Sequence, residues 1–219
     1  MSGFAPPWQQ WRDVVDGVRW RRNRAPVEVG DRPHFDDQAR AHFDAALADA
    51  RVLLEYGSGG STVQASRCVE MVVCVETDRE YLAAVEAAVG DALATMVYCY
   101  VDIGATAQWG APLLKVGTGR QRRRWARYPW RPWEVSTATP DVVLVDGRFR
   151  VASVAATMLR APRARILVDD YTDRPFYWAV DAVGERVAQA GRMVEFRRRE
   201  AIGDDDLLAV VDAFAADWR

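Results

Sequence analysis

Apolar runs alternate with helical patterns along the chain from about residue 35 to the end. Five runs are rich in branched aliphatic and aromatic residues and are bounded by polar residues or glycines, which predicts buried strands. They cover residues 51–56, 71–75, 95–101, 141–146 and 165–169. The tail contains two more strand candidates, residues 193–198 and 207–211, joined by an acidic turn at 203–206.

Helices are predicted between most of these runs by apolar residues at spacings of three and four. The first covers residues 35–50, with Asp36 or Asp37 able to cap its start. A later helix begins near Pro175 and stops at Gly191. Continuously apolar strands that alternate with helices predict a parallel sheet covered on both faces. The two closing strands have no helix between them, so they predict an antiparallel hairpin at one edge.

The chain has 219 residues, which suits one large domain. We expect this domain over residues 34–219. Residues 1–33, which contain three Trp and a basic cluster, are interpreted as an appended segment or a lid over the site. Residues 103–140 carry eight glycines and prolines and interrupt the alternation, so we expect an insertion of loops and short helices, a kind of segment that is often functional.

Composition restricts the classes of function. Lys and Arg number 29 and Asp and Glu 31, so the net charge of −2 gives no general attraction to polyanions. Charge-free stretches such as residues 92–101 are much shorter than the roughly 20 residues of a membrane-spanning helix, so no membrane partner is expected. The N-terminus has neither a basic start nor an apolar leader, which favours a cytoplasmic protein. Cys68, Cys74 and Cys99 lie in or beside apolar runs and are expected to be buried thiols.

The most informative stretch is the glycine-rich turn after the first strand, residues 54–62. A strand that ends in glycines and opens into a helix lets the backbone approach a ligand and points free N–H groups at it. Gly57 and Gly59 fit the first two glycines of a dinucleotide fingerprint, but Thr62 occupies the third place. The Walker phosphate-binding loop needs a Gly-Lys-Ser/Thr ending, which this turn lacks. Both alternatives are therefore weakened.

Glu55, two residues before Gly57, favours another ligand. Here the sequence resembles the class I S-adenosylmethionine-dependent methyltransferases, whose first motif is an acidic residue, a spacer and a Gly-x-Gly turn. A carboxylate at Glu55 would repel a pyrophosphate but accept the ammonium group of methionine. A tight strand–helix turn without a ligand is the alternative interpretation. The resemblance implies cofactor contacts from Glu55, Gly57, Ser58, Gly59, Gly60 and Ser61 to the amino acid part, from Glu76 to the ribose and from Asp102 to the adenine.

The resemblance also implies the fold and the reaction. It implies an α/β fold, a single Rossmann-like domain with a mostly parallel seven-stranded sheet, an antiparallel C-terminal hairpin edge and helices on both faces. S-adenosyl-L-methionine would be the cofactor, and a small molecule or sugar would be methylated at oxygen. Two alternatives stay open, a non-catalytic S-adenosylmethionine-binding domain and a dinucleotide or nucleotide-sugar enzyme. Glu76 also suits a nicotinamide-dinucleotide enzyme, and Asp102 also suits a solvated strand end.

Carboxylates collect at the ends of the fourth and fifth predicted strands, where Asp146 ends one and Asp169 and Asp170 end the next. Ligands bind at this edge of open α/β sheets. Three clustered acids repel one another unless a positive charge neutralises them, and Mg²⁺ with oxygen ligands would do so. The arrangement is similar to that of the cation-dependent O-methyltransferases, which implies these three aspartates as metal ligands.

The chain departs from those families just after Asp146, where Arg148 and Arg150 follow in place of the usual Lys or His. Together with Arg174, these side chains could neutralise the carboxylates without a metal, so Mg²⁺ and arginine pairing both stay open. Asp146 could accept the proton of the acceptor, and Asp146 and Arg148 are the candidate catalytic residues. His34, in the lead-in, could also fold over the site.

His42 shares the apolar face of a predicted helix and favours core packing over catalysis. Residues 120–133 form the densest basic and aromatic patch of the chain. Arg there could clamp an acidic acceptor and Trp could stack on a ring, so we expect a small acidic or aromatic acceptor. Packing of this patch against Trp8, Trp11 and Trp20 is the structural alternative. Nucleic acid is disfavoured by the net charge of −2, and exposed Trp in residues 1–33 make a homodimer plausible.

Overall fold

The computed structural model describes residues 7–219, and the side chains from residue 11 onward. Seven strands form one sheet in the order β3-β2-β1-β4-β5-β7-β6. The strands are β1 Val52–Tyr56, β2 Met71–Glu76, β3 Thr95–Tyr100, β4 Val142–Val145, β5 Arg165–Val168, β6 Gly184–Ala190 and β7 Met193–Arg198. Strands β1 to β5 pair in parallel, and β7 is antiparallel to both of its neighbours. The predicted mostly parallel seven-stranded sheet with an antiparallel hairpin edge is confirmed.

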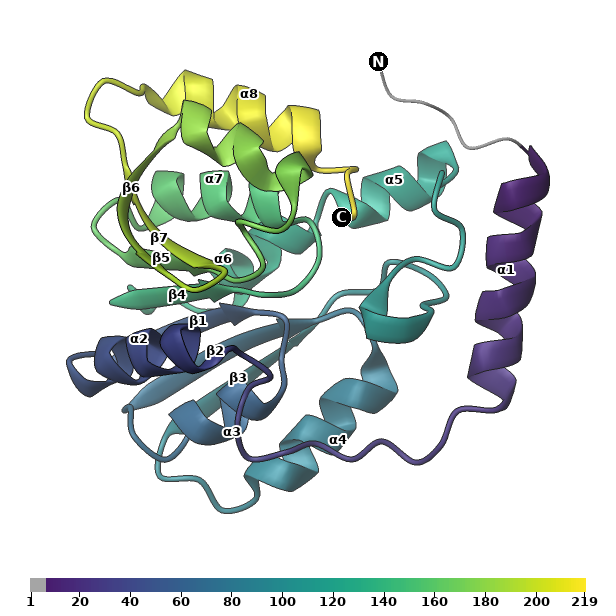
Figure 1. The fold of residues 1–219 in the computed structure, drawn as a ribbon, viewed down its shortest axis with the longest axis horizontal. Helices are drawn as coiled ribbons and strands as arrows, with labels where there is room; N and C mark the ends of the chain where they lie inside the picture. The colour runs from purple at the N-terminus through teal and green to yellow at the C-terminus, as the bar shows by residue number, and fades with distance from the viewer. Residues whose placement is uncertain (1–6) are drawn as a thin grey trace.

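Helices cover both faces of this sheet, with α2, α3 and α4 on one side and α7 and α8 on the other (Figure 1). The α-helices are α1 Pro7–Arg22, α2 Asp37–Ala48, α3 Gly60–Ala65, α4 Arg79–Val89, α5 Gly119–Trp125, α6 Arg131–Val135, α7 Arg150–Arg160 and α8 Asp204–Phe214. Three 3-10 helices are η1 Gln108–Gly110, η2 Tyr128–Trp130 and η3 Pro175–Ala182. None of the helices within residues 7–219 combines the length and apolar character needed to cross a bilayer.

The apolar runs form strands because alternate side chains can be buried against helices on both faces. Leu54 and Tyr56 pack into the core cluster that includes α7 and α8, whereas Leu53 packs into the cluster that includes α2. All four residues of β4 are buried. Cys74 and Cys99 are buried as predicted, but Cys68 is exposed, because it follows α3 at the surface, so the prediction for Cys68 was wrong.

The start of α2 confirms the predicted cap. An Asp36 side-chain oxygen accepts a hydrogen bond from the backbone N–H of Ala39 at 2.9 Å. The other oxygen accepts from the N–H of Arg192 at 3.0 Å, which attaches the helix to the turn of the β6–β7 hairpin. One aspartate therefore serves both a helix start and a long-range contact.

The C-terminal tail differs from the sequence prediction. Residues 207–211 were predicted to form a strand, but they lie within helix α8. Asp204, Asp205 and Asp206 make up its first turn, where negative charge is favoured, and Asp206 accepts a hydrogen bond from the N–H of Gly203. Leu207 and Val211 are four residues apart and both are buried.

The hairpin is confirmed, but its first strand lies where a helix was predicted. The helix expected from Pro175 to Gly191 is a 3-10 helix, η3, followed by strand β6. Val187, which lies within the range expected to be helical, is an exposed residue of β6. Gly191 has φ +58° in the tight turn between β6 and β7, so it supplies a hairpin turn and not a helix end.

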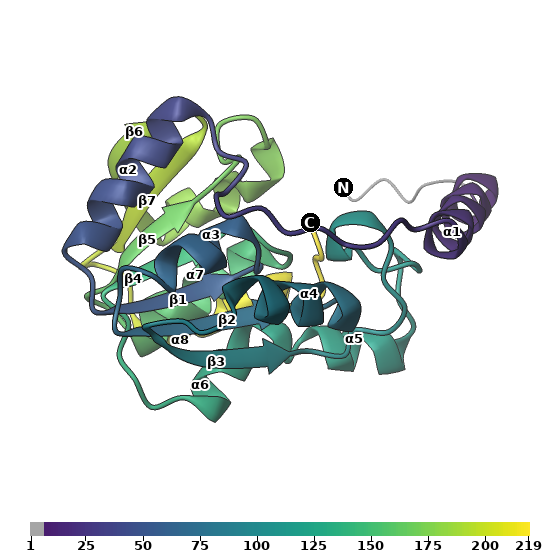
Figure 2. The ribbon, with the colours of Figure 1, turned by 90° about the horizontal axis from the view of Figure 1, so that it is seen from below.

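Helix α1 stands apart from the sheet and lies beside the insertion (Figure 1 and Figure 2). Asp13 of α1 forms an ion pair with Lys115 at 3.0 Å, and Arg21 donates to the carbonyl of Thr106. After α1, residues 23–36 run without regular structure back to the start of α2. We call residues 23–36 the strap.

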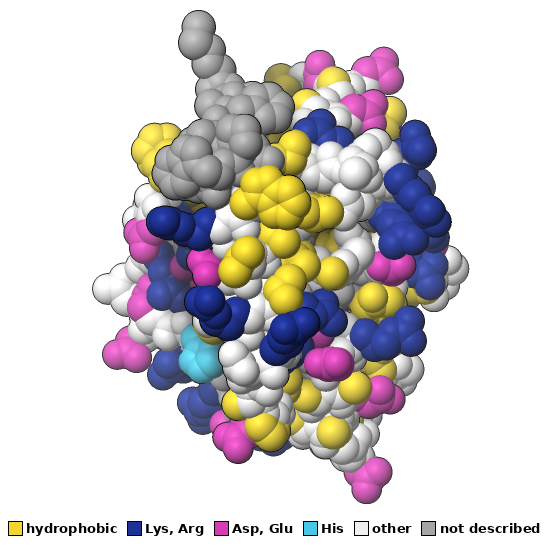
Figure 3. Space-filling model, turned by 90° about the vertical axis from the view of Figure 1, so that its right-hand side faces the viewer, with side chains coloured by type: hydrophobic (Ala, Val, Ile, Leu, Met, Phe, Trp, Pro, Cys, Tyr) yellow, Lys and Arg dark blue, Asp and Glu magenta, His cyan; other side chains and the backbone are white. Residues whose placement is uncertain are grey.

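The outer side of α1 is apolar. Trp11, Val15 and Val18 are exposed along it, Trp11 by 71%. Figure 3, which views the molecule from the side of α1, shows hydrophobic side chains gathered near the middle of this face with Lys and Arg around them. A homodimer stays a prediction. The side chain of Trp8 lies outside the described residues.

Candidate functional site

The C-terminal ends of β1 and β4 carry two turns that touch each other. The first, which we call the glycine turn, is Gly57-Ser58-Gly59-Gly60. Gly57 has φ +99°, and a Cβ atom there would come 2.5 Å from the nitrogen of Gly147, in the turn after β4. A Cβ on Gly60 would overlap the backbone of Arg32, so the strap lies directly over the start of α3. Glycines are therefore required where three backbone segments meet.

Glu55 lies beneath the glycine turn. Its carboxyl group is fully buried and accepts hydrogen bonds from the hydroxyls of Ser61 and, at 2.6 Å, Thr62. Within residues 11–219 no Arg or Lys pairs with it. Burial is the main cause that raises the pKa of Glu55 to about 8. The carboxyl group of Glu55 is therefore mostly protonated near neutral pH, and a positive charge beside it would favour its ionised form.

Glu76, at the end of β2, is folded back on its own backbone. It accepts hydrogen bonds from the N–H of Thr77 at 2.6 Å and of Asp78 at 3.0 Å, and from the hydroxyl of Ser58 at 3.2 Å. Burial raises its pKa. The contact with Ser58 joins the end of β2 to the glycine turn, and a cofactor shared by Ser58 and Glu76 stays a prediction.

The insertion forms a wall beside Glu76. The carbonyl of Gly110 accepts from the hydroxyl of Thr77 at 3.0 Å, and the carbonyl of Trp109 accepts from Nε of Arg148 at 2.8 Å. Trp109 is 70% exposed and has φ +61°, an unusual conformation for a residue with a side chain. Such backbone strain is concentrated at functional sites.

Asp102 follows β3 and is half exposed. It pairs with Arg124 of α5 at 3.1 Å and accepts from the N–H of Gly104 at 2.9 Å. These contacts connect it to the insertion and leave its role toward adenine a prediction.

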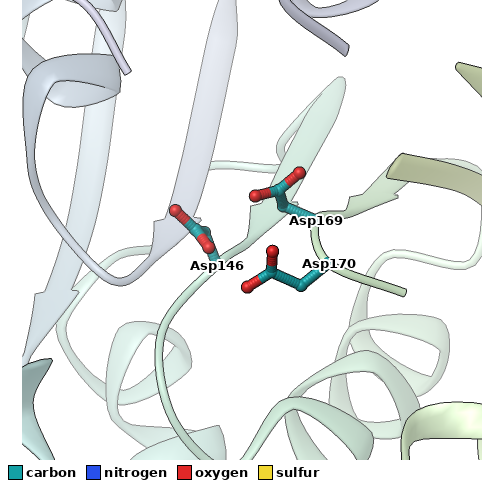
Figure 4. A group of neighbouring side chains, drawn as sticks. All are labelled: Asp146, Asp169 and Asp170. Carbon is teal, nitrogen blue, oxygen red and sulfur yellow. The ribbon is translucent and has the colours of Figure 1, made fainter. Parts of the chain in front are cut away.

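Asp146, Asp169 and Asp170 come together at the ends of β4 and β5, and Asp170 points toward Asp146 (Figure 4). One ligand atom from each lies within 4.8 Å of the others. The sequence therefore predicted the cluster. Burial, followed by the charge of Asp146, raises the pKa of Asp169 to about 6.

Arginines already engage this cluster. Arg150 lies 2.9 Å from Asp146 and 3.6 Å from Asp170. Arg192 contacts Asp169 at 3.2 Å and Asp170 at 3.0 Å, and five of the six carboxylate oxygens lie within 3.4 Å of a guanidinium nitrogen. Three carboxylates and three guanidinium groups balance, so the residues present do not fit a divalent cation.

The arginine set differs in part from the sequence prediction. Arg150 and Arg174 pair with the cluster, the latter with Asp170 at 3.0 Å. Arg148 bonds to the Trp109 carbonyl instead. Arg192 was missed, because it sits in the hairpin turn that the sequence analysis had assigned to the end of a helix.

Neither histidine ring contacts the aspartate cluster. His42 lies 2.9 Å from Glu195, which also binds Arg165 on the α2 side of the sheet, so its role is structural. His34 is exposed, and its backbone carbonyl accepts from Arg192. The strap is thereby attached to the aspartate cluster through Arg192.

Residues 120–133 separate into a basic surface and an aromatic core. Trp125 and Tyr128 are fully buried, and Trp125 donates to the carbonyl of Ile103 at 2.9 Å. Arg120 and Arg123 are exposed on α5. Trp125 and Tyr128 therefore cannot stack on an acceptor ring. The segment packs into the core, while Trp11 and Trp20 belong to α1, which contacts the earlier part of the insertion.

Comparison with solved structures finds a crystal structure of a methyltransferase-like protein from Silicibacter pomeroyi. It is 31% identical to this chain, with a TM-score of 0.72, and the match covers 86% of this chain and 100% of that chain. An O-methyltransferase from Bacillus cereus is 12% identical, with a TM-score of 0.42 over 98% of this chain and 82% of that chain. The N-methyltransferase NodS from Bradyrhizobium japonicum is 10% identical, with a TM-score of 0.45 over 88% and 98%.

The last two superpose too loosely to bear on function. No protein-family model matches the sequence. No curated protein matches it either.

Proposed function

Because this chain belongs to the class I S-adenosylmethionine-dependent methyltransferase family, we propose that it methylates a hydroxyl oxygen of a small-molecule or sugar acceptor. Membership rests on 31% identity over the whole of the Silicibacter pomeroyi chain and on the similarity of the two folds. It replaces the dinucleotide and nucleotide-sugar alternative.

The buried carboxyl group of Glu55 is the main support for S-adenosylmethionine as the cofactor. A buried carboxyl group held only by hydroxyls, with no cationic side chain of residues 11–219 beside it, is stabilised in its ionised form by an incoming positive charge. The ammonium group of S-adenosylmethionine supplies that charge at the glycine turn. When bound, this cofactor contributes a methyl group on a positively charged sulfur. Glu76 would accept hydrogen bonds from the ribose hydroxyls in place of the one it now receives from the hydroxyl of Ser58.

Asp146 is the proposed proton acceptor. Its Oδ1 is held by Arg150, whereas Oδ2 has no hydrogen bond within residues 11–219 and its side chain is 35% exposed. Loss of solvent is the largest cause that raises its pKa, and Asp170 adds to this against the opposing charge of Arg150. A carboxylate with one fixed and one free oxygen can orient an acceptor hydroxyl and take its proton. Arg148, on the same turn, would bind an acidic group of the acceptor.

The strap and α1 are proposed as the lid of this site. Arg24 pairs with Asp78 at 2.8 Å and with Glu80 at 3.3 Å, next to Glu76. The strap backbone also covers Gly60. A bound cofactor at the glycine turn would lie beneath this segment, so ligand binding is expected to slow proteolysis within residues 23–36.

Two measurements test the proposed function. Titration calorimetry should show binding of S-adenosylhomocysteine and none of NAD. Methyl transfer from labelled S-adenosylmethionine is then measured over a panel of hydroxylated acceptors, including sugars and aromatic acids. Asp146→Asn is expected to lower turnover by about 10²- to 10⁴-fold with cofactor affinity nearly unchanged. Asp205→Asn, at the exposed start of α8, is the matched control.

The outcomes separate enzyme from binding domain. Binding of S-adenosylhomocysteine without transfer to any acceptor would favour a non-catalytic S-adenosylmethionine-binding domain. Binding of NAD alone would end the cofactor proposal.

A further inference from the structure

Tyr128 of η2 links the insertion to the two turns. It is fully buried, and its ring packs against those of Tyr56 and Phe149 at centroid separations of 5.7 and 5.1 Å. A Cβ atom on Gly147 would come 2.5 Å from Oη of Tyr128 and 2.8 Å from the nitrogen of Gly57. The hydroxyl group therefore lies beside the point where the turns after β1 and β4 touch.

This hydroxyl group has no hydrogen-bond partner among the residues that the structure describes. The backbone amide of Arg148 favours negative charge on Oη, but an amide N–H is a donor and cannot accept the phenolic proton. Burial holds the pKa of Tyr128 well above its ordinary value, so the proton is present at physiological pH. A buried donor without an acceptor is destabilising, and in a native protein it points to a water or a ligand.

Tyr56 lies in the same core cluster, but its hydroxyl group, unlike that of Tyr128, has hydrogen-bond partners. Its Oη donates to the carbonyl of Pro129 at 2.6 Å and accepts from Nε1 of Trp133 at 3.0 Å. Within residues 11–219, the buried tyrosine hydroxyls without a partner are those of Tyr128, Tyr171 and Tyr177. Tyr128 is the member of this group that meets Gly147.

We propose that Tyr128 donates a hydrogen bond to the carboxylate of the amino acid group bound at the glycine turn, an inference that rests on the proposed function. Strand alternation places Glu55 on the α3 side of the sheet, whereas Tyr56 and the ring of Tyr128 lie on the α7 side. The turn thus has an acid on one side and a hydroxyl donor on the other.

The chemistry of an α-amino acid matches this pair. Its ammonium and carboxylate groups share one carbon atom, so a ligand whose ammonium group meets Glu55 presents its carboxylate close by. Hydrogen bonds to an ionised acceptor are shorter and stronger than those between neutral groups. Tyr128 would thus contribute to affinity through the amino acid part of the cofactor alone.

Tyr128→Phe tests this with two ligands. S-adenosylhomocysteine carries the amino acid group, and 5′-methylthioadenosine has the nucleoside and sulfur without it. Calorimetry is expected to show about 10- to 100-fold weaker binding of S-adenosylhomocysteine by the variant, with unchanged affinity for methylthioadenosine. The ligand-free variant is expected to melt no lower than the wild type, because a group without a partner is removed.

Tyr56→Phe is the matched control. It removes a satisfied hydroxyl, so it should lower the melting temperature while leaving the ratio of the two affinities unchanged. An equal loss for both ligands, or no loss for S-adenosylhomocysteine, would overturn the role of Tyr128 and leave the methyltransferase proposal standing. A wild-type protein that binds neither ligand would overturn both.

Discussion

Nη2 of Arg150 lies 2.9 Å from Oδ1 of Asp146, on the turn that carries the proposed proton acceptor. The same side chain donates to the backbone carbonyls of Gly147 and Asp169, and it is 4% exposed. It therefore holds the ends of β4 and β5 together.

Arg150→Met should remove this connection and leave Asp146 without the counter-charge that holds its Oδ1. Breaking a buried pair from one side costs about 3 to 5 kcal/mol of unfolding free energy. Denaturant unfolding measures the loss. Arg163→Met, at an exposed position, is expected to change the free energy by less than about 0.5 kcal/mol. Similar values for both variants would contradict this role of Arg150.

Cofactor binding should release a proton at pH 7. Glu55, with a pKa of about 8 in the free protein, is mostly protonated there, and an ammonium group beside it favours the ionised form. Calorimetry of S-adenosylhomocysteine in buffers of different ionisation enthalpy measures the release, which is expected to approach one proton per site. Glu55→Gln should abolish it. A buffer-independent heat in the wild type would show that Glu55 keeps its proton.

Stability is expected to depend on Asp169 between about pH 4 and 6. The pKa of this group is about 6 in the folded protein, against 3.8 as its ordinary value. The folded state therefore binds the proton more tightly than the unfolded chain does, and the contribution to stability declines as pH rises through this window. Unfolding free energies measured from pH 4 to 7 test the slope. In Asp169→Asn this part of the decline should disappear.

Mg²⁺ is expected to change neither the melting temperature nor the turnover of the wild type, because guanidinium groups already balance the aspartate cluster. Arg192→Gln removes one of these charges, and millimolar Mg²⁺ should then raise the melting temperature of the variant. Arg163→Gln serves as the control. Loss of wild-type activity with a chelator, restored by Mg²⁺, would re-establish Asp146, Asp169 and Asp170 as a metal site.

Gly57→Ala should be strongly destabilising. The residue has φ +99°, and a Cβ atom would press on the backbone of Gly147. Left-handed backbone and overpacking together predict a loss of about 2 to 4 kcal/mol. Gly119→Ala, at the start of α5 with nothing within 4 Å of the new atom, should be neutral or up to about 1 kcal/mol more stable. Denaturant unfolding of both variants provides the comparison.

Strands β1 to β5 and the glycine turn were predictable because their signals are local. Residues 71–75, for example, are apolar throughout, which predicts a buried strand. Gly57 directly follows β1 and tolerates the positive φ that the turn there requires. The tail was less predictable. Leu207 and Val211 suit one face of a helix and also a short apolar strand, and packing against α7 decides between them.

The candidate site was predictable in part for the same reason. Parallel strands bring Asp146 and Asp169 to one edge whatever else the chain does. Arg192 reaches that cluster from a hairpin turn whose position depends on the whole sheet. Tyr128 gives no sequence signal that distinguishes its hydroxyl from that of Tyr56, since the difference lies in tertiary contacts.

Strand order also has a consequence for how the chain is made. Central strand β1 pairs on one side with β2, which follows it closely, and on the other with β4, whose residue Val142 pairs with Leu53 from much further along the chain. During synthesis on the ribosome, the open side of β1 stays exposed until the insertion and β4 have emerged. Nascent chains arrested before β4 should therefore associate with chaperones, and those arrested beyond α7 should escape them.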